Sequence, residues 1–245
     1  MGTKNNDSIN NGYKIPNIIH QTFYTKVLPN DIVNIIKKNK LICPGCKFVF
    51  YNDNDCDNFI RKNFDIRTYN AFKRINDCYG AMKADFFRYC VLYKIGGIYL
   101  DIKSSIHFPI FSIIQPNDIC LLDLPRNYEE PWRTNSPTYE QWLLMFAPGH
   151  PYLLTMIELM INYIETKYEP KIVGIPVLNS KQKILNVTGP DAFTKAINSY
   201  ISKENTVLHR NIDYNKYFSI RTTNYSKMYS GGRKHYSEYK LPLYK

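Results

Sequence analysis

The feature that most constrains the fold is a helical pattern that stops at a glycine pair and is followed directly by a short apolar strand. Apolar residues recur at helical spacing from about residue 70 to 94, which predicts one long helix. Gly96 and Gly97 end that helix, and residues 98–100 are predicted to form a buried strand with Asp101 at its carboxyl end. Ligands of open α/β sheets bind outside the carboxyl ends of strands, so Asp101 is a candidate site residue.

Further segments predict the same α/β class. A second short strand also ends in an acid, Asp123, which repeats the pattern of Asp101. Strands and helices alternate along the chain, and this order is typical of a sheet covered by helices. The other strands are predicted at about 15–20, 47–51, 119–122 and 142–146, and the other helices at about 32–40, around Phe59, at 151–168 and after Pro190.

The length of 245 residues suits one large core and is short for two full-sized domains. We expect residues 1–14 to be disordered and residues 15–245 to form one domain, with a tail from about residue 225 that folds over it as a loop or lid. No apolar stretch approaches the roughly 18 residues of a membrane span. The polar N-terminal residues lack the apolar segment of a signal peptide, which predicts a cytoplasmic protein.

The charge of the chain favours anionic ligands. Lys and Arg number 32 against 21 Asp and Glu, which gives a formal net charge of +11. Nucleic acid, a membrane surface and a phosphorylated small molecule all fit such an excess. A basic nucleic-acid-binding protein is therefore one alternative, since the Tyr and Phe residues could stack on bases, but no RRM, KH, zinc-finger or helix-turn-helix pattern is present. The abundance of Lys, Asn, Ile and Tyr also fits an AT-rich genome, which would explain part of the charge.

Six cysteines are too few and too scattered for a disulfide framework in a chain of this length, so we expect free thiols. Cys43 and Cys46 have the spacing of a zinc knuckle. A structural zinc site needs four ligands, and no second pair follows. A turn carried by Pro44 and Gly45 is the better interpretation.

Asp85 and Arg88 lie three residues apart in the predicted long helix and therefore share a face. Such a pair can present an acceptor and a planar cation to one ligand. The alternative is a surface ion pair of little energetic importance. The apolar neighbours Phe86 and Phe87 favour half-buried charges, which must have a partner. We expect Arg88→Ala to abolish function while the fold stays intact.

Five segments carry a resemblance to a known family. They are 18–23 (IIHQTF), 83–89 (KADFFRY), 93–101 (YKIGGIYLD), 147–151 (APGHP) and 188–190 (TGP). In this order they resemble the successive blocks of the DXD-containing glycosyltransferases of family 32, which include fungal α-mannosyltransferases and capsular polysaccharide sugar transferases. The resemblance implies a GT-A fold, a Rossmann-like nucleotide-sugar-binding domain. It also implies retaining transfer of a sugar from a UDP- or GDP-sugar to a glycan, protein or lipid acceptor.

The same resemblance implies roles for individual residues. The residues implied in donor binding are His20, Gln21, Thr22, Phe23, Asp85, Arg88, Lys103 and Gln141. Thr22 and Phe23 would line the base pocket, although Phe23 could equally be a core residue. Asp85, Arg88 and Asp101 form the implied catalytic set. Asp101, the first acid of the motif, and His235 in the tail would hold Mn²⁺ or Mg²⁺, although His235 could also be a solvated loop histidine.

One departure from the family pattern bears on the metal. The motif reads Asp101-Ile102-Lys103, so a cation replaces the second acid. Residues two apart on an extended strand point to the same side, so Lys103 would repel a divalent ion or replace part of its charge. The possible outcomes are a metal held by Asp101 with other ligands, a metal-free transferase that uses Lys103 and Arg88, and a sugar-binding protein without catalysis. We expect the first, with His235 as the further ligand.

Overall fold

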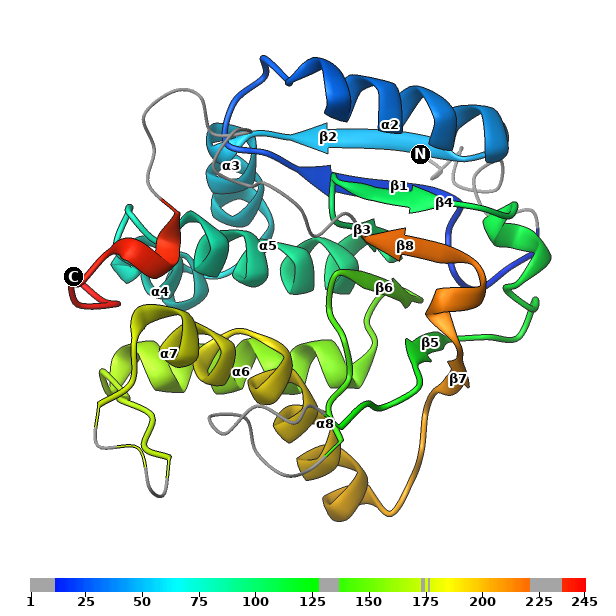
Figure 1. Ribbon diagram of the computed structural model, residues 1–245. Helices are drawn as coiled ribbons and strands as arrows, with labels where there is room; N and C mark the ends of the chain where they lie inside the picture. The colour runs from blue at the N-terminus through cyan, green and yellow to red at the C-terminus, as the bar shows by residue number, and fades with distance from the viewer. Residues whose placement is uncertain (1–11, 128–136, 173–174, 176, 221–234) are drawn as a thin grey trace, which may run out of the picture.

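The protein is built around a six-stranded sheet of order β2-β1-β3-β6-β5-β7 (Figure 1). This computed structural model describes residues 12–127, 137–172, 175, 177–220 and 235–245. The six strands are β1 (Ile18–Thr22), β2 (Lys47–Tyr51), β3 (Gly97–Leu100), β5 (Cys120–Asp123), β6 (Leu143–Phe146) and β7 (Arg210–Ile212). Strands β2, β1 and β3 are parallel, β6 runs antiparallel between β3 and β5, and β7 pairs with β5 in parallel. The predicted α/β class is confirmed.

Helices and a small second sheet cover the central sheet. The helices are α2 (Asn30–Ile42), α3 (Asp53–Asn63), α4 (Ile66–Arg74), α5 (Gly80–Ile95), α6 (Pro151–Glu165), α7 (Ser180–Val187) and α8 (Pro190–Glu204), with the 3-10 turns η1 (Ile110–Ser112), η2 (Tyr214–Lys216) and η3 (Tyr236–Glu238). The second sheet pairs β4 (Ser104–Ile106) with β8 (Phe218–Ile220) in antiparallel orientation. Helix α2 packs against β4, whereas α5 packs against α3, α6 and the strands β1, β3 and β6 (Figure 1).

The central strands are buried on both faces. On β3, Tyr99 packs into the cluster formed with α5, α6 and α8, while Ile98 and Leu100 pack into the cluster on the other face. On β5, Leu122 and Leu121 divide between the two clusters in the same way. A strand with two buried faces is a continuous apolar run, which explains why these strands were readily predicted.

The predicted long helix over residues 70–94 is wrong as one element. The structure has two helices there, α4 and α5, separated by residues 75–79. Within this break the Cys78 N–H donates to the Asn76 side chain at 3.3 Å, and the Tyr79 N–H donates to the Asn76 carbonyl at 2.9 Å. Asn76 forms a turn because its side chain competes with the helical backbone for hydrogen bonds.

Helix starts explain the other differences. At the start of α3, Asn52 and Asp55 form a capping box. Helix α7 was not predicted, and Asn179 and Gln182 form a capping box at its start. Helix α2 begins two residues before the expected position without a side-chain cap, and Asp31 lies in its first turn. These signals are local and were present in the sequence.

Residues 235–245 lie against the break between α4 and α5. The Asn76 N–H donates to the Leu243 carbonyl at 2.9 Å, and the Lys245 N–H donates to the Arg74 carbonyl at 2.7 Å. Leu243 and Tyr244 are buried. The expected lid from about residue 225 lies outside the described residues up to 234, as do residues 1–11 of the expected disordered start. Within the described part of the chain, no helix has both the length and the apolar character needed to cross a bilayer.

The glycine pair lets the chain reverse from α5 into the centre of the sheet. Gly96 caps α5 with φ of +71°, and Gly97 opens β3 with φ of +98°. A Cβ atom on Gly97 would lie 2.6 Å from the carbonyl oxygen of Ile18 on β1. Only glycine permits both this positive φ and this close approach.

We expect Gly97→Ala to lower the free energy of unfolding by about 2 kcal/mol or more, because strain at a positive φ adds to the clash with β1. Gly45→Ala is the matched control, since a Cβ there meets nothing within 4 Å and its φ is not positive. Urea unfolding of the two variants measures the difference. Equal midpoints for both variants would contradict this account of the β3–β1 contact.

Candidate active site

A cavity of about 900 Å³ lies at the carboxyl edge of the sheet. Thr22 ends β1, Asp101 follows β3, and Gln141 and Trp142 precede the antiparallel β6, so all four reach the same edge and line the cavity. The Asp101 N–H donates to the Trp142 carbonyl at 2.8 Å, which joins two of these segments. The volume is in the range of small-molecule sites, roughly 300–1,000 Å³.

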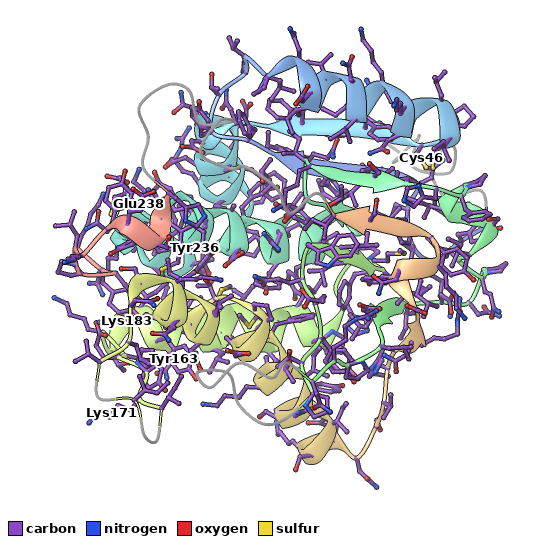
Figure 2. All side chains as sticks on the ribbon, in the orientation of Figure 1. Cys46, Tyr163, Lys171, Lys183, Tyr236 and Glu238 are labelled. Carbon is purple, nitrogen blue, oxygen red and sulfur yellow. The ribbon has the colours of Figure 1, made fainter. Side chains whose placement is uncertain are left out.

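Elements distant in sequence complete the cavity wall. Helix α5 contributes Asp85 and Arg88, the start of α7 contributes Lys181, and η3 follows directly on His235. Figure 2 shows Tyr236 and Glu238 of η3 on the same side of the molecule as Lys183 of α7. The predicted site residues that line the cavity are Thr22, Phe23, Asp85, Arg88, Asp101, Lys103, Gln141 and His235.

Asp85 is buried and has partners for both carboxylate oxygens. The Gln141 side-chain amide donates to one oxygen at 3.2 Å, the Thr188 hydroxyl donates to the other at 2.8 Å, and an Arg88 nitrogen lies 3.1 Å away. The Tyr89 hydroxyl donates to Gln141 and fixes its amide. Burial raises the pKa of Asp85 to about 6, against the opposing effect of the Arg88 charge. Asp85 therefore holds the site in shape from within a satisfied network.

Arg88 joins the acid of α5 to the acid that follows β3. Its terminal nitrogens lie 3.1 Å from Asp85 and 3.4 Å from Asp101, and one donates to the Gln141 carbonyl at 2.6 Å. Its guanidinium carbon lies 4.5 Å from the centre of the Tyr99 ring, a cation–π contact. The remaining nitrogen, Nε, is buried without a hydrogen-bond partner in the described chain. The two charges of the i, i+3 pair are thus each other's partners as well as cavity-lining groups.

Lys103 and His235 border the same cavity near further charges. Burial lowers the pKa of Lys103, with Asp101 opposing the shift and Arg88 adding to it. Burial also lowers the pKa of His235, and the charges of Lys181 and Lys103 add to that shift while Glu238 opposes it. His235 caps η3, contacts Ser237 and lines the cavity as a half-buried residue.

His20 and Gln21 do not line the cavity, in contrast to the expectation from the sequence. His20 is fully buried, with its ring nitrogens 2.9 Å from the Gly96 carbonyl and 3.2 Å from the Tyr51 hydroxyl. Gln21 is 3% exposed and donates to the Leu100 carbonyl at 3.4 Å. Both side chains tie β1 to its surroundings and so position Thr22 at the strand end.

Asp123 is also a structural residue rather than a cavity residue. Its carboxylate accepts hydrogen bonds from the backbone N–H groups of Leu124 and Tyr214, both at 2.9 Å, and pairs with Arg126. The cysteine pair is remote from η3: Figure 2 shows Cys46 on the opposite side of the molecule from Tyr236. The six cysteines are free thiols, as expected.

Two cavity residues were missed by sequence reasoning. Glu140 precedes Gln141, and burial raises its pKa to about 7, with the Asp123 charge adding to the shift. Its position at the cavity depends on the antiparallel direction of β6, which the sequence does not reveal. Lys181 was missed because its helix was missed, although the Asn179 capping box was a usable signal.

Comparison with known proteins shows that the chain is similar to sugar transferases. The family described as "Glycosyltransferase sugar-binding region containing DXD motif" matches residues 29–119. "Inositol phosphoceramide mannosyltransferase 3" of Schizosaccharomyces pombe is 30% identical over 152 residues, which are 60% of this chain and 38% of that protein. Over these segments the chain is similar to the DXD-containing glycosyltransferases, as the sequence resemblance implied.

Two further comparisons support this similarity and the fold. "Initiation-specific alpha-1,6-mannosyltransferase" of Candida albicans is 25% identical over 181 residues, 65% of this chain and 45% of that protein. The chain thus spans less than half the length of these relatives. The solved structure "PaToxG Glycosyltransferase" matches with a TM-score of 0.54 and 16% identity, over 77% of this chain and 70% of that one. This likeness confirms the α/β fold of GT-A glycosyltransferases.

DXD-containing glycosyltransferases generally use a divalent metal, but the side chains here do not fit one well. In the described part of the chain, no group of three or more His, Cys, Asp or Glu side chains could hold a metal ion. The single charge of Asp101 is already faced by Arg88 and Lys103. Two unit charges about 4 Å apart interact by roughly 4 kcal/mol near a protein surface, and the repulsion doubles for a divalent ion. Metal binding by the expected ligands Asp101 and His235 is therefore opposed by the neighbouring cations.

The burial of Arg88 corrects the expectation that Arg88→Ala leaves the fold intact. We expect this variant to lose about 3–5 kcal/mol of unfolding free energy, because it leaves Asp85 buried without its cation. Arg67→Ala is the control, since Arg67 pairs with Glu158 and Glu165 on the surface and its loss should change little. Chemical denaturation of both variants checks this, and a wild-type midpoint for Arg88→Ala would show that the pair is not structural.

His20 should make the protein less stable in acid. Burial lowers its pKa to about 4 from 6.5, so between these values the unfolded chain binds a proton that the folded chain excludes. As pH falls through this range, the free energy of unfolding decreases, by on the order of 3 kcal/mol in total. We expect His20→Gln, which can still donate to Gly96, to show a shallower loss of stability between pH 6.5 and 4.

The matched control for this slope is His107→Gln, because His107 is exposed and contacts only Ser219 through its ring. Its unfolding midpoint should follow the wild-type pH dependence. An unchanged slope in the His20 variant would mean that His20 is charged in the folded protein.

Proposed function

We propose that this chain transfers a sugar, with retention of anomeric configuration, from a nucleoside-diphosphate sugar to an acceptor hydroxyl. One observation carries the proposal: Asp85, Arg88, Asp101 and Gln141 converge from separate elements on one ligand-sized cavity. They do so at the carboxyl edge of the sheet, where α/β folds bind ligands, and in a chain similar to the DXD-containing glycosyltransferases.

The geometry suggests how a donor would lie. Thr22 and Phe23 follow β1 and would contact the nucleotide, with the Phe23 ring against the base. The donor sugar would contact the Asp85–Arg88 network together with Gln141. The diphosphate would then lie nearest Asp101 and Lys103, at the end of β3.

The transfer reaction requires little general acid–base catalysis by the protein. The bond between the anomeric carbon and the diphosphate oxygen breaks as the acceptor oxygen attacks from the same face. The acceptor proton passes to the departing diphosphate oxygen, so no separate general base is needed. The cavity contributes by orienting the sugar and by placing positive charge near the leaving group, where negative charge develops.

The relatives indicate which donor to test first. Their printed names share mannosyl transfer, and some of them name inositol phosphoceramide as acceptor. A mannosyl nucleotide is therefore our first candidate donor for this chain. The acceptor classes to test are a glycan, a protein and a lipid.

A thermal-shift screen tests the proposal. It compares GDP-mannose, GDP-fucose, UDP-glucose, UDP-galactose and UDP-N-acetylglucosamine, each with and without Mn²⁺. A donor at about 100 times its Kd should stabilise the fold by roughly 2.7 kcal/mol, visible as a raised Tm. Phe23→Ala should weaken donor binding by about 1–3 kcal/mol if the ring stacks on the base.

Donor hydrolysis, followed by mass spectrometry, then separates binding from catalysis. Asp101→Asn should lower hydrolysis, because it removes the carboxylate that pairs with Arg88. Glu158→Gln, a surface change outside the cavity, should leave hydrolysis intact. Binding without hydrolysis by the wild type would favour a sugar-binding protein. Failure of every donor, together with salt-dependent retention on single-stranded RNA or DNA, would favour the nucleic-acid alternative.

A further inference from the structure

Lys103, which stands in place of the second acid of the motif, is accompanied in the cavity by further basic side chains. Lys103 lies in the turn between β3 and β4, Lys181 at the start of α7, and His235 at the start of η3, and all three line the cavity. The charges of both lysines act on the His235 ring, so the three groups are close together although they are distant in sequence. The two ammonium groups and the His235 ring form a cluster that is built from three separate elements.

This cluster sits beside the acid that the family uses for metal. Asp101 is the acid of the motif that this chain retains, and a terminal nitrogen of Arg88 lies 3.4 Å from its carboxylate. The charge of Asp101 also acts on the Lys103 ammonium group. A divalent ion at Asp101 would lie beside the cations Arg88 and Lys103 as well as near the carboxylates of Asp85 and Glu140. A diphosphate would be attracted by Arg88 and by the two lysines, and repelled by the carboxylates.

Half-buried cations are suited to this task. Lys103 is a half-buried residue that lines the cavity. Ammonium groups bind phosphate as point charges through charge-assisted hydrogen bonds. A bound diphosphate would accept such hydrogen bonds from the cluster.

We propose that Lys103, Lys181 and His235 bind the diphosphate of the donor directly and take the place of the divalent metal. The inference rests on the proposed function and adds that this site works without metal. During transfer the cluster neutralises the negative charge that collects on the departing diphosphate.

Isothermal titration with GDP and UDP, each in excess EDTA and again with Mn²⁺, tests the proposal without relying on activity. We expect at least one of them to bind the wild type with a Kd that changes no more than about twofold between the two conditions. Lys181→Met should weaken that binding by about tenfold, the effect of losing one charge-assisted contact.

Lys183→Met is the matched control, because Lys183 lies on the same helix but pairs with Glu169 and does not line the cavity (Figure 2). It should bind like the wild type. Lys103→Asp restores the second acid of the motif, so its binding should fail in EDTA and recover with Mn²⁺. The Tm of each variant without ligand shows whether it has folded.

The outcomes separate the two proposals. Wild-type binding that disappears in EDTA and returns with Mn²⁺ would overturn the metal-free site while leaving the proposed function standing. Equal losses from Lys181→Met and Lys183→Met would overturn the assignment of the cluster. Absence of binding by GDP and UDP in both conditions would overturn the proposed function itself.

Discussion

The buried guanidinium of Arg88 is the interaction on which the site depends. It connects α5 to the end of β3 through Asp85 and Asp101, and to the start of β6 through the Gln141 carbonyl. A buried charge without partners is very costly, so these three segments are held at fixed separations by the need to satisfy it. The same contacts leave part of each polar group facing the cavity. The same set of interactions therefore stabilises the fold and shapes the site.

The reversed direction of β6 is the second constraint. Because β6 runs against β3, the residues before it reach the same edge of the sheet as the residues after β3. Gln141 can then bind both Asp85 and Arg88, and Glu140 comes to border the cavity. An all-parallel sheet would send these residues to the opposite edge.

The sequence predicted best the strands that are buried on both faces. It predicted worst the residues whose position depends on contacts between elements distant in sequence. The strand at 98–100 and the acid after it were predicted because a fully buried strand is a continuous apolar run. The donor role given to His20 and Gln21 was wrong because β1 is itself buried, and only its last residue, Thr22, reaches the cavity. The position of Lys181 at the cavity depends on how α7 packs against η3, which no local pattern encodes.

The packing of the C-terminal residues affects how the molecule can fold. Residues 235–245 bind the turn around Asn76, and Tyr79 donates a hydrogen bond to the Leu241 carbonyl. One wall of the cavity thus consists of residues that are synthesised long after the helix they cover. Contacts of such sequence separation carry a large loop-closure entropy and form slowly. The cavity wall formed by residues 235–237 is complete only when this segment has docked.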